Sequence, residues 1–189
     1  MLTRAVIGEV ERTENQHHER IHATVSKRDE SASAWKAWED AARAWHAVRH
    51  PTERLWGDKF LSDLRASERS AIEDAILFLE VDPWYFRSGY LKERLIRGLK
   101  AAKLSEQDRR RLWNVVWNVA SGKNRREFRD FCSLAVVVGD SDLIQMLEEV
   151  PSSRDCAAKG KFSYLLNYLR QNKKTANKSE QATPRKPSD

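Results

Sequence analysis

Apolar residues recur with a helical period along most of the chain. From residue 33 onward they are spaced three or four positions apart, which places them on one face of an α-helix. Trp35, Trp38 and Trp45 share such a face and predict a helix over 33–49. Pro51 occupies a position that the first turn of a helix tolerates, and the pattern then continues to about residue 65. We expect these two helices to form a hairpin.

The same period predicts further helices as far as residue 169. Ser67 and Ser105 are the expected N-caps of two of them. The helix over 105–121 is apolar on nearly all sides, apart from a narrow stripe of Asn114 and Asn118, so we expect it to be central and buried. The stretch 136–138 suits a strand as well as a helix. The predicted helices beyond residue 66 lie at 67–81, 90–99, 105–121, about 124–138, 141–150 and 162–169.

Both ends of the chain depart from this pattern. Residues 1–32 show no sustained period, although Ala5–Ile7 with Val10 suit a brief strand, and we expect a weakly ordered N-terminal segment. Residues 171–189 combine basic and small polar side chains with two prolines and no apolar period, which predicts a disordered basic tail. A helical-repeat domain is therefore expected over 33–170.

The first helices of successive predicted hairpins begin near Ser67, Ser105 and Asp140, a spacing found in paired-helix solenoids. The stretch Gly-Asp-Ser-Asp-Leu-Ile-Gln-Met-Leu-Glu-Glu-Val at 139–150, followed by Pro151 and another helix, resembles HEAT-like repeats. This resemblance covers about 67–170 and implies a recognition surface or scaffold. The expected fold class is all-α, with stacked helical hairpins that form either a short HEAT-like α-solenoid or an irregular helical bundle.

The composition indicates the class of protein and its expected location in the cell. The chain has 189 residues, of which 33% are charged, with 7 glycines and 5 prolines, values that suit a soluble helical protein. We find neither a signal-peptide pattern nor the run of about 20 apolar residues that a membrane span needs. Cys132 and Cys156 form neither a disulfide framework nor a CxxC pair, so we expect reduced thiols and a cytoplasmic location.

The positive charge is concentrated in one segment. The net charge is +6, yet residues 87–129 alone hold 13 basic and 4 acidic residues. Such a segment predicts an anionic partner, either an acidic protein surface or a nucleic acid, although helical surfaces also carry Arg and Lys that only solubilise. Trp84, Tyr85 and Phe86 stand at a turn beside it and suit base stacking or the anchoring of a partner. We assign Trp45, Trp113 and Trp117 to the core. The candidate binding residues are Arg87, Lys92, Arg94, Arg97, Arg109, Arg110, Arg111, Lys123, Arg125, Arg126, Arg129, Trp84 and Tyr85.

One string points to catalysis instead. His18-Glu19-Arg20-Ile21-His22 fits H-E-x-x-H, in which two His bind zinc and the Glu activates a water molecule. Only 17 residues precede the string, and no third zinc ligand stands in a recognisable follow-on motif. We therefore expect no catalytic zinc and no cofactor, and interpret the chain as a non-catalytic binding module, with a zinc-dependent hydrolase as the alternative.

Overall fold

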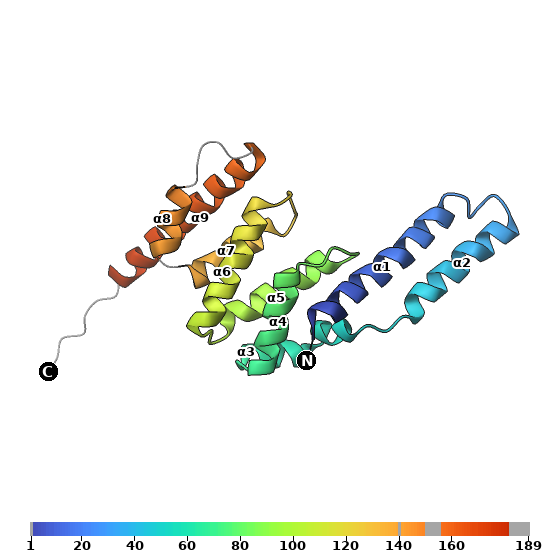
Figure 1. Cartoon of the computed structure of the whole chain (residues 1–189), viewed down its shortest axis with the longest axis horizontal. Helices are drawn as coiled ribbons and strands as arrows, with labels where there is room; N and C mark the ends of the chain where they lie inside the picture. The colour runs from blue at the N-terminus through green and yellow to red at the C-terminus, as the bar shows by residue number, and fades with distance from the viewer. Residues whose placement is uncertain (1, 140, 150–155, 182–189) are drawn as a thin grey trace. The chain divides into compact units, whose positions relative to one another are not determined.

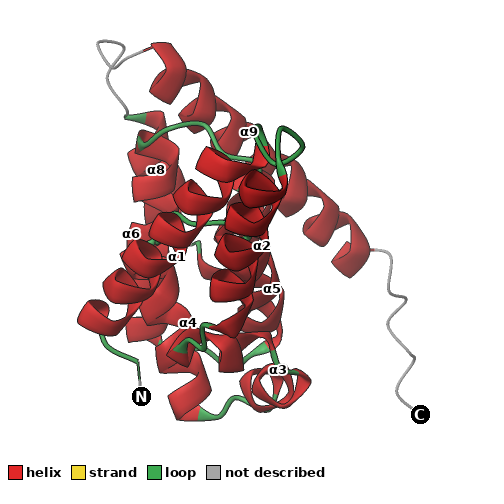
Figure 2. Cartoon of the chain, turned by 90° about the vertical axis from the view of Figure 1, so that its right-hand side faces the viewer, coloured by secondary structure: helices red, strands yellow, loops and turns green. Residues whose placement is uncertain are grey.

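The computed structural model describes residues 2–139, 141–149 and 156–181. All regular structure in these ranges is helical, as predicted, and they contain no strand (Figure 2). The chain divides into two compact units, Met1–Leu104 and Ser105–Asp189. The repeat domain expected over 33–170 stays a prediction. In order, the helices are α1 (Arg4–Val25), α2 (Ala32–Ala47), the 3-10 helix η1 (Pro51–Trp56), α3 (Asp58–Arg65), α4 (Arg69–Val81), α5 (Ser88–Ala101), α6 (Glu106–Ser121), α7 (Phe128–Val138), α8 (Ser141–Glu148) and α9 (Cys156–Gln181).

The first 32 residues are not a weakly ordered segment, because most of them form α1, which lies alongside α2 (Figure 1). The Thr3 hydroxyl caps the helix by accepting a hydrogen bond from the Val6 amide, 3.2 Å away. Ile7 and Val10 are buried against the rest of the unit. Beyond Val10 the helix bears mostly polar side chains, which is why its apolar period is too short to recognise in the sequence.

The helix over 33–49 is confirmed as α2, but its hairpin partner is α1 and not the segment after Pro51. That segment is also divided, since η1 ends at Gly57 and α3 begins directly after it. Four elements, namely η1, α3, α4 and α5, pack together around Leu55, Leu64 and Phe78, with α1 against α4 and η1. The N-terminal unit thus has its core beside one end of the α1–α2 pair (Figure 1).

Ser67 is not the N-cap of α4. Its φ is 68°, in the left-handed region, and its hydroxyl accepts a hydrogen bond from the Lys103 amide at 2.8 Å. The N-cap is Glu68, which makes no side-chain capping bond. Ser105, in contrast, caps α6 as predicted, and its exchange of hydrogen bonds with Asp108 forms a capping box.

In the C-terminal unit, α6 packs against α7 and α9, and α8 packs against α9. Asn114 and Asn118 form the expected exposed stripe on α6. Residues 136–138 are helical, because Val138 is buried with the rest of the apolar face of α7. The last helix continues through Gln181, so the first part of the predicted disordered tail is helical; residues 182–189 lie outside the described residues, as does the Asp140 cap.

Four consecutive helices each bury one apolar face. In each of α4, α5, α6 and α7 some of the buried positions are spaced i, i+3, i+4, i+7, as on any helix with one buried face. They include Ile72, Ala75, Ile76 and Leu79 in α4; Lys92, Leu95, Ile96 and Leu99 in α5; Leu112, Val115, Val116 and Val119 in α6; and Phe131, Leu134, Ala135 and Val138 in α7. Lys92 is thus a charged side chain on the buried face of α5.

Candidate recognition site

The turn between α4 and α5 has an unusual backbone. Asp82 and Arg87, which bracket it, have φ values of 53° and 67°, and Pro83 between them is buried. Non-glycine residues in this region cost about 1–3 kcal/mol each, so they persist only where the surroundings hold them. The turn is therefore fixed by contacts from outside itself.

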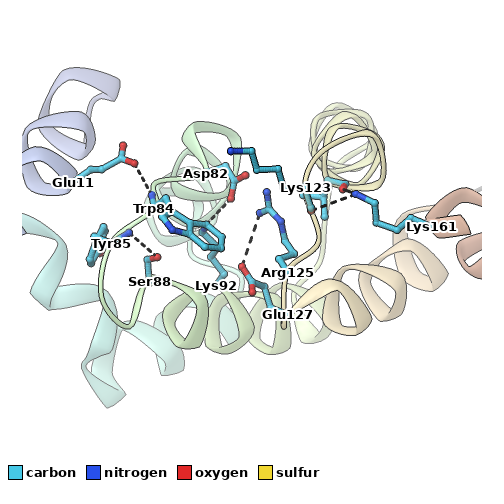
Figure 3. A network of polar contacts seen from close by, with 11 residues as sticks. Glu11, Asp82, Trp84, Tyr85, Ser88, Lys92, Lys123, Arg125, Glu127 and Lys161 are labelled. Atoms are coloured by element: carbon cyan, nitrogen blue, oxygen red, sulfur yellow. Dashed lines mark hydrogen bonds and ion pairs between the residues drawn. The ribbon is translucent and has the colours of Figure 1, made fainter. Parts of the chain in front are cut away.

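Polar contacts from α1 and α5 hold the turn (Figure 3). The Trp84 amide donates to Glu11 Oε1 at 2.7 Å, and Asn15 Nδ2 donates to the Trp84 carbonyl at 2.9 Å. The Tyr85 amide donates to Ser88 Oγ at 3.2 Å. Both backbone groups of Trp84 are thus satisfied by α1, which leaves the indole pointing away from these bonds.

Lys92 anchors the start of the same turn. Its side chain is fully buried, and Nζ lies 2.5 Å from Asp82 Oδ1 and 5.7 Å from the centre of the Trp84 ring. A buried ammonium needs such a partner, since its desolvation is otherwise very costly. Lys92 therefore does not belong to a solvent-facing binding surface, where the sequence prediction put it.

The turn presents aromatic rings to solvent. Trp84 is 59% exposed and Phe86 is 48% exposed, large values for side chains of this type. Tyr85 points inward instead, where burial raises the pKa of its hydroxyl to about 12 and Thr52 hydrogen-bonds to it. Of the three aromatic residues singled out from the sequence, Trp84 and Phe86 expose much of their rings to solvent, and Tyr85 lines the neighbouring pocket.

Beside the turn lies a pocket with a volume of about 450 Å³. Its walls come from α1, the end of α2, η1 and the α4–α5 turn, so residues far apart in the sequence meet there. Trp45, which we had assigned to the core, is half-buried and lines this pocket. The lining residues are Glu14, Trp45, His46, Val48, Arg49, Glu53, Trp56, Tyr85, Phe86 and Arg87.

Aromatic contacts shape the pocket. The Trp45 and Phe86 rings meet edge to face with their centres 5.4 Å apart. The Arg87 guanidinium lies over the Trp56 ring, 5.3 Å from its centre. Within the described part of the chain, Arg87 has this ring contact but no hydrogen-bond acceptor or carboxylate partner. Its side chain is exposed, so its donors are accessible from solvent.

The other charged groups of the pocket are already engaged. Glu14 accepts a hydrogen bond from Trp45 Nε1 at 2.9 Å, and its second oxygen lies 3.0 Å from His50 Nε2. Glu53 accepts from the His50 amide at 3.3 Å, and Arg49 donates to carbonyls at the end of α2. Arg87 is thus the charged side chain of the pocket that is left for a ligand.

The basic residues of 87–129 are divided between the two units, so the idea that they form one surface stays a prediction. On α5, Arg94 lies 2.7 Å from Asp58 and Arg97 lies 3.6 Å from Glu93. These carboxylates offset part of the charge counted from the sequence, although exposed pairs of this kind bind weakly.

Several of the basic residues in the C-terminal unit also contact their own surroundings. Arg109 donates to the Val137 carbonyl, and Arg110 lies 3.3 Å from Glu106. The Arg125 side chain is only 9% exposed and lies over the Phe131 ring. Arg111 is half-buried, while the residues of this group that are exposed to solvent are Arg110, Lys123, Arg126 and Arg129.

A smaller cavity of about 330 Å³ lies in the same unit, between α6 and the α7–α8 region. Arg109, Arg110 and Trp113 line it. Both arginines make the contacts just described, so this cavity offers less free hydrogen-bonding capacity than the pocket beside the turn.

The H-E-x-x-H string lies in the second half of α1. His18 Nε2 and His22 Nε2 are 3.2 Å apart, and Glu19 is exposed. Within the described residues, no group of three or more His, Cys, Asp or Glu side chains is placed to hold a metal ion. A catalytic zinc site uses three protein ligands. The zinc-dependent hydrolase stays a prediction, in which His18 and His22 are two of these ligands.

The sequence did not reveal Trp56 and Glu14 as site residues. These residues belong to the site only because the fold brings them together, and a pattern of apolar residues within one helix contains no information on such contacts.

No helix in the described ranges is long and apolar enough to cross a membrane. Comparison with known protein families, with curated proteins and with solved structures found no match to the chain.

Proposed function

We propose that the chain is a non-catalytic binding module whose N-terminal unit recognises an acidic segment of a partner protein. The observation that carries this proposal is the hydrogen-bonded α4–α5 turn, which exposes Trp84 and Phe86 beside a pocket with the guanidinium of Arg87 in its lining. Tryptophan and arginine are the residues most enriched among the energetic centres of protein interfaces. A held turn also loses little conformational entropy when a partner binds.

The aromatic residues supply the apolar part of the interaction. Burying about 100 Å² of further apolar surface on Trp84 and Phe86 gives roughly 2–3 kcal/mol. Arg87 supplies the charged part, since its planar donors match a carboxylate in a bidentate arrangement. The complementary ligand is a peptide with a large apolar side chain close to an Asp or Glu.

Charge favours a protein partner over a nucleic acid at this site. The N-terminal unit holds 18 basic and 17 acidic residues, so it is nearly neutral. Nucleic-acid binding usually draws its affinity from several phosphate contacts, whereas the pocket has one unengaged cation. The basic surface over 87–129 remains a second element of the proposal, through its exposed members on the C-terminal unit.

We also infer a relationship to HEAT-like repeats. The succession of helices α4, α5, α6 and α7, each with one buried apolar face, supports it, because a helical solenoid is built from such helices. A cytoplasmic location is part of the same proposal, supported by Cys132, a free thiol inside the C-terminal unit.

A displayed library of random peptides, selected on the full-length chain, tests the function. We expect enriched peptides to contain an aromatic or large aliphatic residue next to Asp or Glu. Trp84→Ala and Arg87→Glu are each expected to weaken their binding at least about tenfold, the scale of an interface hot spot. Trp35→Ala is the matched control, because Trp35 is a similarly exposed indole, 48%, that contacts Trp38 and does not line the pocket.

Two results would contradict the proposal. One is enrichment of peptides that bind wild type and Trp84→Ala equally. The other is binding of labelled single-stranded or duplex RNA or DNA at about 50 mM salt that is lost in Arg87→Glu, which would assign the site to nucleic acid.

A further inference from the structure

Two imidazoles face each other on α1, one helical turn apart. The Nε2 atoms of His18 and His22 are 3.2 Å apart, and the ring centres are 4.3 Å apart with the planes inclined by 62°. The same nitrogen of each ring is therefore the atom brought close to the other ring.

We propose that His18 and His22 form a binding site for one divalent transition-metal ion. Two imidazole nitrogens at about 2.0–2.1 Å from a tetrahedral ion lie about 3.3 Å apart, close to the observed separation. Imidazole nitrogen suits Zn²⁺, Ni²⁺ and Cu²⁺, whereas Mg²⁺ and Ca²⁺ prefer oxygen. The site discriminates between these two classes of cation.

A metal ion can replace the hydrogen bond between the two rings without a change in the number of protons. When the two neutral rings hydrogen-bond through Nε2, one of them carries its proton on Nε2 and donates it to the other. Metal binding requires both Nε2 atoms to be bare, which moves that proton to Nδ1 of the same ring. The ion then takes the place of the shared hydrogen, and the neutral pair releases no proton.

The surroundings hold the pair in place and leave it accessible. The His18 ring stacks on Phe86 with centres 5.4 Å apart and an angle of 22°, and it meets Trp45 edge-on at 6.4 Å. His22 is exposed, so an ion arrives from solvent. Two protein ligands leave the remaining coordination positions to water or to an external ligand, unlike a closed structural zinc site. This site does not depend on the proposed peptide recognition.

The test uses the full chain without an affinity tag. Isothermal titration with Ni²⁺ and Zn²⁺ is expected to show one saturable ion per chain, and titration with Mg²⁺ to show none. His22→Ala is expected to weaken binding at least about tenfold. His46→Ala is the matched control, because His46 is an exposed histidine in the last turn of α2 outside the pair, and it should bind as wild type does.

A spectroscopic measurement makes the test independent of folding effects. The electron paramagnetic resonance spectrum of the Cu²⁺ complex should show coupling to two imidazole nitrogens in wild type and in His46→Ala. In His22→Ala this signature should be lost, while circular dichroism stays that of wild type. The proposal is overturned if wild type binds no ion below about 100 μM, if His22→Ala binds as tightly as wild type, or if His46→Ala loses binding equally.

Discussion

Asp82→Asn tests whether the buried Lys92 charge holds the recognition turn. The variant keeps a side chain that tolerates positive φ but removes the carboxylate 2.5 Å from Nζ. Removing one partner of a buried pair costs about 3–5 kcal/mol, and because Asp82 is 30% exposed we expect about 2–3 kcal/mol here. In the N-terminal unit, Met1–Leu104, this loss of free energy of unfolding lowers Tm by about 10 °C.

A second variant separates charge burial from loss of the turn. Since an uncharged side chain at residue 92 needs no carboxylate partner and the buried face of α5 is otherwise mainly apolar, Lys92→Met added to Asp82→Asn should recover most of the lost stability. Urea unfolding followed by far-UV circular dichroism measures the free energies of unfolding. Asp63→Asn is the control, because its ion pair with Lys59 is exposed and contributes only about 0–1 kcal/mol.

The reasoning is refuted if Asp82→Asn unfolds within about 0.5 kcal/mol of wild type. It is equally refuted if the double variant is less stable than Asp82→Asn, since an unpaired buried ammonium would then not be the cause.

Three further outcomes are expected. The pKa of Tyr85 is raised to about 12, so the folded state favours its neutral hydroxyl. The stability that this hydroxyl contributes below pH 10 is therefore lost as the pH rises towards 12. In urea unfolding, Tyr85→Phe should reduce the fall in the free energy of unfolding between pH 10 and pH 12. Burial likewise raises the pKa of the Cys132 thiol to about 12, so at pH 8 in a Cys156→Ser background it should react with a maleimide far more slowly when folded than in urea. Lys161→Met should destabilise the C-terminal unit by about 1–3 kcal/mol, because three backbone carbonyls lose their donor; a thermal transition unchanged from wild type would show that water replaces it.

The sequence predicted those elements whose stability comes from their own apolar face. The helix over 105–121 is the clearest case, because a capping serine, a central run of apolar residues and a stripe of two asparagines all lie within one segment. In α7, burial of Val138 decided between helix and strand, and a local β-propensity contains no information on burial.

Prediction failed where distant polar groups hold the chain. In α1, Glu11, Glu14 and Asn15 bond to residues 30 to 75 positions away, so a period of apolar residues does not detect this helix. The candidate site has the same origin, since its pocket joins side chains from four elements. Charge counting likewise identified Lys92 as basic but not as buried, because burial depends on the register of α5.

The lysine that bridges α9 to α6 also bears on how the protein is made. Lys161 Nζ lies 3.3 Å from the carbonyls of Val119 and Lys123 and also bonds to that of Gly122. These acceptors leave the ribosome well before their donor does, and chains emerge at about 5–20 residues per second. During that interval the end of α6 depends on water for its hydrogen bonds. The N-terminal unit ends at Leu104, so all of its residues are synthesised before α6 and its partner lysine.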